Sequence, residues 1–261
     1  MKKLLLLSAL CLFNFLSFPQ ENINKTDSKG MKQGKWVSRY PGGSLKYEGA
    51  FDQNKPVGVW RRYHENGATK ALMYYRPNSE RVSASLFDDK GTLYAKGIFE
   101  GNLRDSTWNF FIGEKLIRIE NYKLGKKEGK SIGFDRNGRV NTEKEWKNDL
   151  PEGRCVDYYP GGTKRSEVSY LEGKRNGPAV FYDESGVVSM EGKYTNDLSD
   201  GDWNVYDKDG KLKYVIKYNK GEIANKDALD SMQLEEFSKY EKARGQIAEP
   251  KVNENGMPER P

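Results

Sequence analysis

Few residues of this chain have the types and spacing that catalysis or metal binding requires. The single histidine, His64, lies beside Glu65 in a predicted turn, and no nucleophile stands at a telling spacing from it. A general base needs a partner within hydrogen-bond reach, and the sequence suggests none, so we interpret His64 as a solvated turn residue. Cys155 stands where other parts of the chain have tryptophan, which predicts a small buried residue. No catalytic residue is therefore predicted.

Metal and cofactor sites are not predicted either. One histidine and two cysteines are too few for a His-rich or Cys-rich metal centre. No glycine-rich loop opens a predicted helix, so no nucleotide-binding motif is indicated. Four glutamates recur at matching positions, and we expect them to pair with lysines across strands: Glu48, Glu143, Glu167 and Glu191.

The main charge feature is an excess of cations in the middle of the chain. Residues 115–147 include ten basic and five acidic residues, while the whole chain has a net charge of +6. Eight of the ten form a candidate binding site for an anionic surface: Lys115, Arg118, Lys123, Lys126, Lys127, Lys130, Arg136 and Arg139. Such a basic rim suits anionic lipid, anionic glycan or an acidic protein. The alternative, which we favour, is a charged edge that discourages pairing between sheets.

The elements that carry these residues form a repeat array. Turn glycines recur mostly every 24 residues, with Lys115 in the one missing slot: Gly43, Gly67, Gly91, Gly138, Gly162, Gly186 and Gly210. An aromatic column keeps the same register: Phe51, Tyr75, Phe99, Tyr122, Trp146, Tyr170, Tyr194 and Tyr218. So does a tryptophan column: Trp36, Trp60, Ala84, Trp108, Ser131, Cys155, Ala179 and Trp203. Agreement between columns indicates about eight copies over residues 34–222.

Each copy alternates short β-prone runs with turn residues. Asn66-Gly67 is such a turn, because asparagine and glycine accept positive φ. Each copy is therefore predicted to be one β-hairpin, joined to the next by a second tight turn. The fold class that follows is all-β: an elongated antiparallel β-meander of about eight 24-residue hairpin repeats, with a C-terminal helix.

Glycines inside the predicted strands have a packing role. Gly49, Gly97 and Gly192 lie two residues before the aromatic column, on the same strand face. A glycine there leaves room for a neighbouring ring to lie over the backbone. We interpret the aromatic columns as structural, with stacking on a ligand as the alternative for some rings.

These motifs resemble the MORN-repeat family in its bacterial variant. The matching steps are Glu48-Gly49-Ala50-Phe51, Lys96-Gly97-Ile98-Phe99 and Glu191-Gly192-Lys193-Tyr194, together with Gly34-Lys35-Trp36, Gly58-Val59-Trp60 and Gly201-Asp202-Trp203. The resemblance covers about residues 34–222 and implies an extended, twisted β-meander. It also implies the roles associated with such repeats: scaffolding, contact with phospholipid, dimerisation and, for the bacterial variant, neutralisation of a toxin by an antitoxin component.

Segments outside the array have other compositions. Lys2 and Lys3 precede a short apolar run, so residues 1–20 are predicted to be a secretory signal peptide, with a retained N-terminal anchor as the alternative. Residues 21–33 are predicted to be a linker. Apolar residues at helical spacing predict a helix over residues 223–245 that covers the open sheet edge or binds a partner. The polar, proline-bearing residues 246–261 are predicted to be a disordered tail.

Together these features predict a non-enzymatic, exported repeat scaffold that mediates protein–protein interaction in the cell envelope. Its location would be periplasmic, envelope-associated or secreted. One alternative is a peripheral membrane or anionic-polymer binding module that uses the basic residues, and another is an antitoxin-like protein that neutralises a partner toxin. We expect one or more protein partners, with anionic lipid or glycan as further candidates, and no nucleic acid or cofactor.

Overall fold

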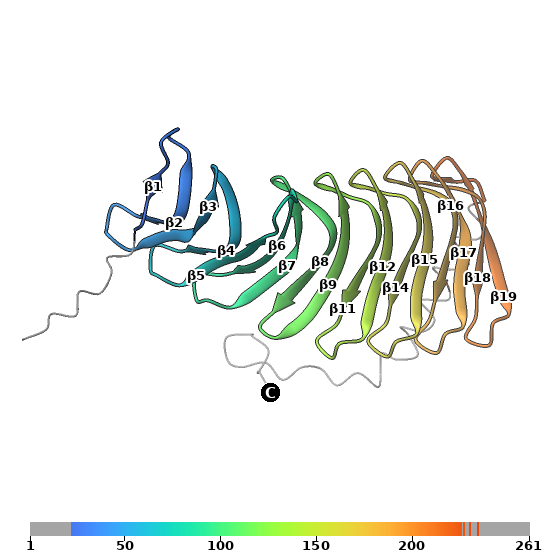
Figure 1. The fold of residues 1–261 in the computed structure, drawn as a ribbon. Helices are drawn as coiled ribbons and strands as arrows, with labels where there is room; N and C mark the ends of the chain where they lie inside the picture. Colours follow the sequence, from blue (N-terminus) through green and yellow to red (C-terminus); the bar gives the residue numbers. More distant parts are fainter. Residues whose placement is uncertain (1–21, 226, 228–229, 231–233, 235–261) are drawn as a thin grey trace, which may run out of the picture. The chain divides into compact units, whose positions relative to one another are not determined.

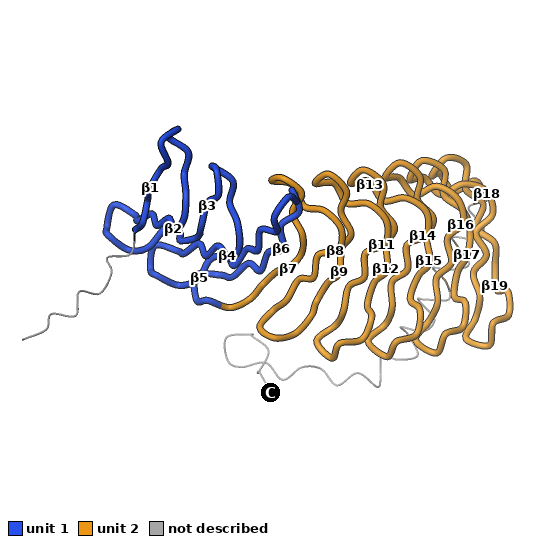
Figure 2. Tube along the Cα trace, in the orientation of Figure 1, with its two compact units in different colours: residues 1–91 blue, residues 92–261 orange. Residues whose placement is uncertain are grey.

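The structure, a computed structural model, describes residues 22–225, 227, 230 and 234. The chain divides into two compact units, residues 1–91 and 92–261 (Figure 2). In the first unit, each strand pairs with the next in antiparallel order. Its strands are β1 (Lys25–Thr26), β2 (Lys32–Arg39), β3 (Leu45–Asp52), β4 (Lys55–Tyr63), β5 (Thr69–Tyr75) and β6 (Arg81–Phe87).

The second unit continues the same pattern with longer runs of hairpins (Figure 1). Its long strands are β7 (Leu93–Glu100), β8 (Leu103–Ile112), β9 (Lys115–Lys123), β11 (Gly129–Phe134), β12 (Val140–Lys147), β14 (Gly153–Tyr158), β15 (Lys164–Leu171), β16 (Lys174–Tyr182), β17 (Val188–Thr195), β18 (Leu198–Tyr206) and β19 (Leu212–Asn219). Three two-residue strands follow tight turns: β10 (Lys126–Lys127), β13 (Leu150–Pro151) and β20 (Glu222–Ile223).

The predicted all-β antiparallel meander of hairpins is confirmed. Residues 25–26 of the segment predicted as a linker form β1, which pairs with β2. The predicted signal peptide (1–20) and tail (246–261) lie outside the described residues, as does most of the predicted helix (223–245). Among the described residues, no helix has the length and apolar character needed to cross a membrane.

One hairpin turn differs from the sequence interpretation. Lys115 does not replace a turn glycine, because it is the first residue of β9 and pairs with Ile112. The turn is Gly113-Glu114, and Gly113 has a φ of 59°. The one-residue deletion in this copy shortens the loop to two residues, so the turn glycine moves back along the chain.

The second tight turns stack on one another along one edge of each unit, which we call the stacked-turn edge. In each case the backbone N–H of a turn residue donates a hydrogen bond to a carbonyl 21 or 22 residues earlier in the chain. In the second unit the donor–acceptor pairs are Gly125–Arg104, Asp149–Lys127, Gly173–Pro151, Asp197–Arg175 and Gly221–Ser199. The opposite edge, which holds turns such as residues 64–68, we call the hairpin edge. Successive copies are thus joined by backbone hydrogen bonds at the turns as well as along the strands.

Tryptophan rings pack directly on glycine backbone, as the sequence predicts. A Cβ atom added to Gly49 would lie 2.2 Å from the Trp60 ring, and one on Gly192 would lie 2.3 Å from Trp203. Gly97 and Trp108 repeat this arrangement. Where the tryptophan column has a smaller residue, the residue eleven positions earlier is larger: Met73 before Ala84, Glu120 before Ser131, Lys144 before Cys155 and Val168 before Ala179.

Side-chain amides continue the pairing at both ends of the array. Asn24 accepts a hydrogen bond from the Val37 N–H (2.8 Å) and donates one to the Val37 carbonyl (2.9 Å). At the other end, Asn225 accepts from the Lys217 N–H and donates to the Val215 carbonyl, both at 2.7 Å. Each asparagine thereby satisfies backbone groups on an outer strand that would otherwise be open to pairing.

The glycine–tryptophan packing makes a direct prediction. We expect Gly192→Ala to lower the free energy of unfolding by about 1–3 kcal/mol, because its methyl group overlaps the Trp203 ring. Urea denaturation followed by circular dichroism measures this change. Gly161→Ala is the control, because Gly161 has no atom within 4 Å of an added Cβ and no positive φ. Equal stability of the two variants would contradict the packing argument.

Candidate functional site

Strand pairing gives each unit two chemically different faces. In the second unit, Trp108, Trp146 and Trp203 lie on one face, which we call the tryptophan face. The opposite face carries Glu143 and Glu167 and we call it the carboxylate face. The first unit has the same division, with Trp60 and Glu48 on opposite faces.

The recurring glutamates do pair with cations, though not always with lysine. Glu143 forms an ion pair with Lys130 at 2.8 Å. Glu167 binds Arg154 through two hydrogen bonds of 2.5 and 2.7 Å and also pairs with Lys164 at 3.0 Å. The hydrogen bonds from Arg154 lower the pKa of the Glu167 carboxyl to about 2. The predicted cross-strand pairing with lysine is therefore confirmed for Glu143. Glu167 pairs across strands with Arg154 instead, and its lysine partner, Lys164, lies on the same strand.

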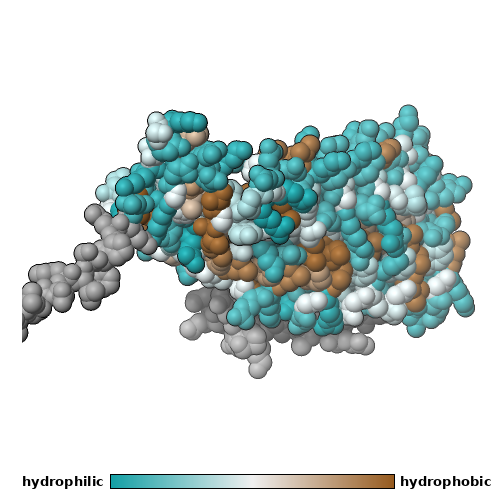
Figure 3. All heavy atoms as spheres, viewed as in Figure 1, coloured by the Kyte–Doolittle hydropathy of each residue, from teal (hydrophilic) through white to brown (hydrophobic). Residues whose placement is uncertain are grey.

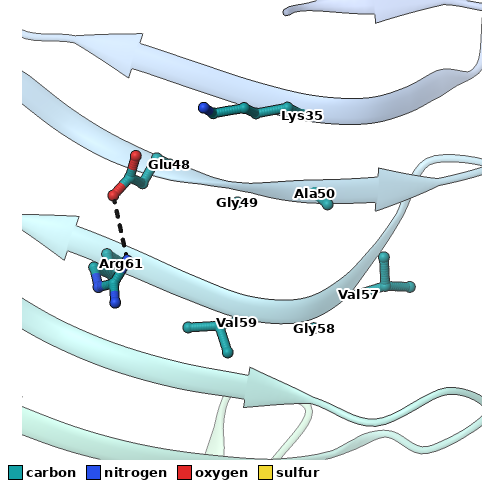
Figure 4. Close-up of a pocket in the computed structure, with 8 residues that line it drawn as sticks. All are labelled: Lys35, Glu48, Gly49, Ala50, Val57, Gly58, Val59 and Arg61. Atoms are coloured by element: carbon teal, nitrogen blue, oxygen red, sulfur yellow. Dashed lines mark ion pairs between the residues drawn. The ribbon is translucent and has the colours of Figure 1, made fainter. Parts of the chain in front are cut away.

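The corresponding region of the first unit holds a shallow hollow of about 400 Å³ on its carboxylate face. Figure 4 shows Lys35, Glu48 and Arg61 on three neighbouring strands, with Val57 and Val59 beside them. Glu48 lies 3.7 Å from the Arg61 guanidinium and accepts a hydrogen bond from the Tyr63 hydroxyl at 2.6 Å. The Glu48 carboxylate in this hollow is thus already paired with groups of the chain itself.

The structure does not gather the eight basic residues into one surface. They divide among four places, with Lys115, Arg136 and Arg139 at the hairpin edge, Lys123 and Lys126 at the stacked-turn edge, Arg118 and Lys127 on the tryptophan face, and Lys130 on the carboxylate face. The nine-residue strand β9 separates the two edges by roughly 30 Å. Basic residues that lie close together in the sequence are therefore found at opposite edges or on opposite faces of the sheet.

Arg118 and Lys127 surround a buried carboxylate on the tryptophan face. Glu120 is 3% exposed and lies 2.7 Å from the Lys127 ammonium and 3.2 Å from the Arg118 guanidinium. The Tyr122 hydroxyl donates a short hydrogen bond to it. Burial opposes ionisation, but the hydrogen bonds from Lys127 and Tyr122 outweigh it, so the pKa of Glu120 lies below its usual value. We call these four residues the Glu120 cluster.

A second hollow, of about 530 Å³, lies on the tryptophan face of the second unit. Its lining includes the rings of Tyr170, Phe181 and Tyr194. The Arg175 guanidinium lies 4.2 Å from the centre of the Tyr194 ring. The nearby tryptophan-column position, Ala179, is fully buried and is not among the residues that line this hollow.

His64 and Cys155 both have structural roles in the fold. His64 is half-buried rather than solvated, and its Nε2 lies 3.0 Å from the Phe87 carbonyl of the next hairpin. Tyr40 occupies the same repeat position and donates to the Tyr63 carbonyl in the same way, at 2.9 Å. Cys155 is buried, as predicted, and burial raises the pKa of its thiol. No group of three or more potential metal ligands occurs among the described residues.

A set of exposed leucines at the stacked-turn edge was not predicted from the sequence. Leu103, Leu150 and Leu198, which we call the leucine row, are 49%, 47% and 47% exposed. Each follows a tight turn, and they recur in alternate copies of the second unit. An alignment of the repeats could have revealed these leucines, because all three occupy the same repeat position. Apolar residues are also visible as patches among hydrophilic ones on the surface (Figure 3).

Comparison with known proteins supports part of the resemblance. A model of the MORN repeat variant matches residues 56–76 and 199–220. The first match covers most of β4 and β5, and the second covers most of β18 and β19. Both stretches contain the glycine and the tryptophan of the columns described above. No curated protein matches the chain. The chain is therefore a hairpin-repeat protein with two copies similar to a module that is typically non-catalytic.

The Glu120 cluster yields a stability prediction. We expect Glu120→Gln to lower the free energy of unfolding by about 1–3 kcal/mol at pH 7, because it leaves Lys127 and Arg118 without their anion. The folded pKa lies below the unfolded value near 4.5, so this stabilisation is present above that pH and is lost as the pH falls further.

Urea denaturation at pH 7 and at pH 3 tests both statements. The difference between wild type and Glu120→Gln should shrink at the lower pH. Glu114→Gln is the matched control, because Glu114 lies exposed in the hairpin turn before β9. A difference that stays constant with pH would show that the charge of Glu120 is not the cause.

Proposed function

We propose that this chain is a non-catalytic scaffold of the cell envelope that binds a partner protein through the stacked-turn edge of its second unit. The observation that carries this proposal is the leucine row. Single exposed leucines are ordinary on protein surfaces, whereas apolar residues repeated along one edge favour an interaction surface. Two copies contain four strands, so neighbouring members of the row are about 19 Å apart.

The surroundings of the row also suit a protein partner. Leu124 and Leu171 add exposed apolar surface at the intervening turns, with 63% and 51% of their area accessible. The stacked turns fix the spacing of the row through backbone hydrogen bonds, such as that from the Gly173 amide to the Pro151 carbonyl (2.9 Å). A partner would therefore meet a preordered edge, which lowers the entropic cost of binding.

The envelope location rests on the N-terminal sequence. Lys2 and Lys3 followed by an apolar run favour export through a signal peptide, which is removed from the mature chain. Under this proposal, the protein isolated from its native cells begins near residue 20.

Loss of partner capture tests the scaffold proposal. The variant Leu103→Gln/Leu150→Gln/Leu198→Gln keeps side-chain size but removes the apolar row. Affinity capture from the native envelope fraction, read by quantitative mass spectrometry, should lose a stoichiometric partner that wild type retains at high salt. Ile112→Gln is the control, because Ile112 is 71% exposed but lies at the hairpin edge. Equal capture by both variants would refute the leucine row as the binding surface.

A second candidate function is binding of anionic lipid at the hairpin edge of the second unit. Lys115 and Arg136 support it, because they line a common hollow of about 380 Å³, and the Lys115 ammonium lies 3.0 Å from the Arg136 carbonyl. Two cations at one rim would attract anionic headgroups in a salt-dependent manner.

Vesicle co-sedimentation distinguishes this candidate. Binding to vesicles with anionic lipid should weaken severalfold in Lys115→Gln/Arg136→Gln, because two charges near the surface are removed. Lys123→Gln/Lys126→Gln is the matched control, since it removes the same charge at the opposite edge. If both variants lose binding equally, attraction is a property of net charge and not of this rim.

A further inference from the structure

We infer that Arg104, on the tryptophan face of the second unit, binds the carboxylate of an acidic side chain from a protein partner. The inference deepens the proposed scaffold function and rests on it, because it names the charged group that the partner would present. Arg104 directly follows Leu103 of the leucine row in β8, so the acidic side chain would bind beside the proposed apolar contact.

Arg104 occupies a repeat position at which the second unit has two other cations, Lys127 and Arg175. All three are the second residue of a strand that follows a tight turn, and all three lie four residues before the tryptophan column. The Lys127 ammonium lies 4.5 Å from the centre of the Trp146 ring, and the Arg175 guanidinium lies 4.2 Å from that of Tyr194. A cation over an aromatic ring is thus a recurring arrangement at this position.

The chain supplies a carboxylate to two of these three cations. Lys127 pairs with Glu120 at 2.7 Å, and Arg175 pairs with Asp197 at 3.2 Å. Among the residues that the structure describes, no carboxylate lies within ion-pair distance of the Arg104 guanidinium. Of the three, Arg104 is therefore the cation whose anion the described part of the chain does not provide.

The identity of one turn residue explains this difference. Asp197 reaches Arg175 from the next tight turn, where its backbone N–H also donates to the Arg175 carbonyl at 2.9 Å. Gly125 makes the same backbone bond to the Arg104 carbonyl, at 2.8 Å, and so occupies the repeat position of Asp197. Because glycine has no side chain, the turn beside Arg104 offers no carboxylate.

Aromatic rings hold the Arg104 guanidinium in place. Its centre lies 5.0 Å from the ring centre of Trp108 and 5.4 Å from those of Phe110 and Tyr122, and all three rings are buried. The guanidinium donates one hydrogen bond, to the Tyr122 hydroxyl at 3.2 Å, and a guanidinium has five N–H groups. A half-buried and already positioned cation attracts an anion more strongly than one in open water, and less entropy is lost on binding.

The local charge balance also favours an anion. Arg104 and the Glu120 cluster together hold three cations and one carboxylate, which leaves an excess of two positive charges. Glu120 is 3% exposed, so an incoming group would meet the cations and not this carboxylate. A guanidinium fits a carboxylate through two parallel hydrogen bonds, as the contact of Arg154 with Glu167 shows within this chain.

Apolar neighbours favour a protein as the source of the carboxylate. Leu103 precedes Arg104 and is 49% exposed, while Leu124 precedes Gly125 and is 63% exposed. A polypeptide presents an acidic and an apolar side chain on adjacent residues, which matches a cation beside exposed leucines. The charge complementarity and the apolar contact would then act on the same segment of the partner.

A variant that supplies the carboxylate from within the chain tests the inference. Gly125→Asp recreates the Asp197 arrangement, and the φ of Gly125 (84°) is close to that of Asp197 (70°). Gly173→Asp is the matched control, because it makes the same change of charge in an equivalent turn that faces Pro151 in place of Arg104. The steric cost is also matched, since an added Cβ would lie 3.2 Å from a leucine side chain at Gly125 and 3.3 Å at Gly173.

The probes are two peptides with blocked termini, acetyl-Gly-Leu-Glu-Gly-amide and acetyl-Gly-Leu-Gln-Gly-amide. Binding is followed by NMR of the Nε–H groups in protein that carries ¹⁵N-labelled arginine, with the Arg104 signal assigned from Arg104→Lys. We expect the glutamate peptide to shift the Arg104 signal saturably and the glutamine peptide to bind about tenfold more weakly. Gly125→Asp should weaken binding of the glutamate peptide severalfold, and Gly173→Asp should leave it unchanged.

A second variant removes the cation without altering the turn. In Arg104→Gln, binding is followed on the Arg118 signal, because Arg118 lies in the adjoining Glu120 cluster. We expect this variant to lose the preference for the glutamate peptide over the glutamine peptide.

Three results would overturn the inference. They are equal binding of the two peptides to wild type, equal weakening by Gly125→Asp and Gly173→Asp, and binding to phosphatidylglycerol vesicles that Gly125→Asp abolishes while no peptide binds. The last result would assign Arg104 to a membrane surface. Each could occur while the leucine-row variant still loses its partner, so failure of the Arg104 site is separable from failure of the scaffold proposal.

Discussion

The packing of an indole ring on bare glycine backbone is the interaction on which the rest of this structure depends. Within residues 22–225 the hairpins form no second layer that would cover the sheet, so the side chains must cover one another. Trp60, Trp108 and Trp203 do so by lying over glycines of the preceding strand and meeting a column ring nearly edge-on. Gly49, Gly97 and Gly192 are the glycines that this packing requires, whereas most other glycines among the described residues have a positive φ.

Departures from that interaction are where the molecule acquires individual chemistry. Each copy without tryptophan compensates with a larger residue on the neighbouring strand, and the compensation takes a different form each time. Glu120 brings a buried charge and its cations, while Val168 is one of the residues that line a hollow on the tryptophan face. The regular copies therefore hold the sheet together, and the irregular copies give one face its distinctive sites.

Periodicity in the sequence was enough to predict the hairpins, the strand faces and the glycine–tryptophan contacts, because all three follow from alternation and turn chemistry. It was not enough to place the basic residues, since positions 115 and 123 lie close in the sequence but at opposite ends of one strand. The bridging role of His64 and the shift of a turn to Gly113 were also missed. Both depend on contacts between copies, or on a deletion, and a single repeat pattern does not encode either.

The asparagines at the two ends have a consequence for how such a protein can change in length. Asn24 and Asn225 occupy the hydrogen-bonding positions that a further strand would need. A new copy added beyond either terminus would meet an outer strand that is already closed. Gain or loss of whole hairpins between Asn24 and Asn225 would therefore leave both sets of contacts intact, whereas a further strand at either position would have to displace an asparagine.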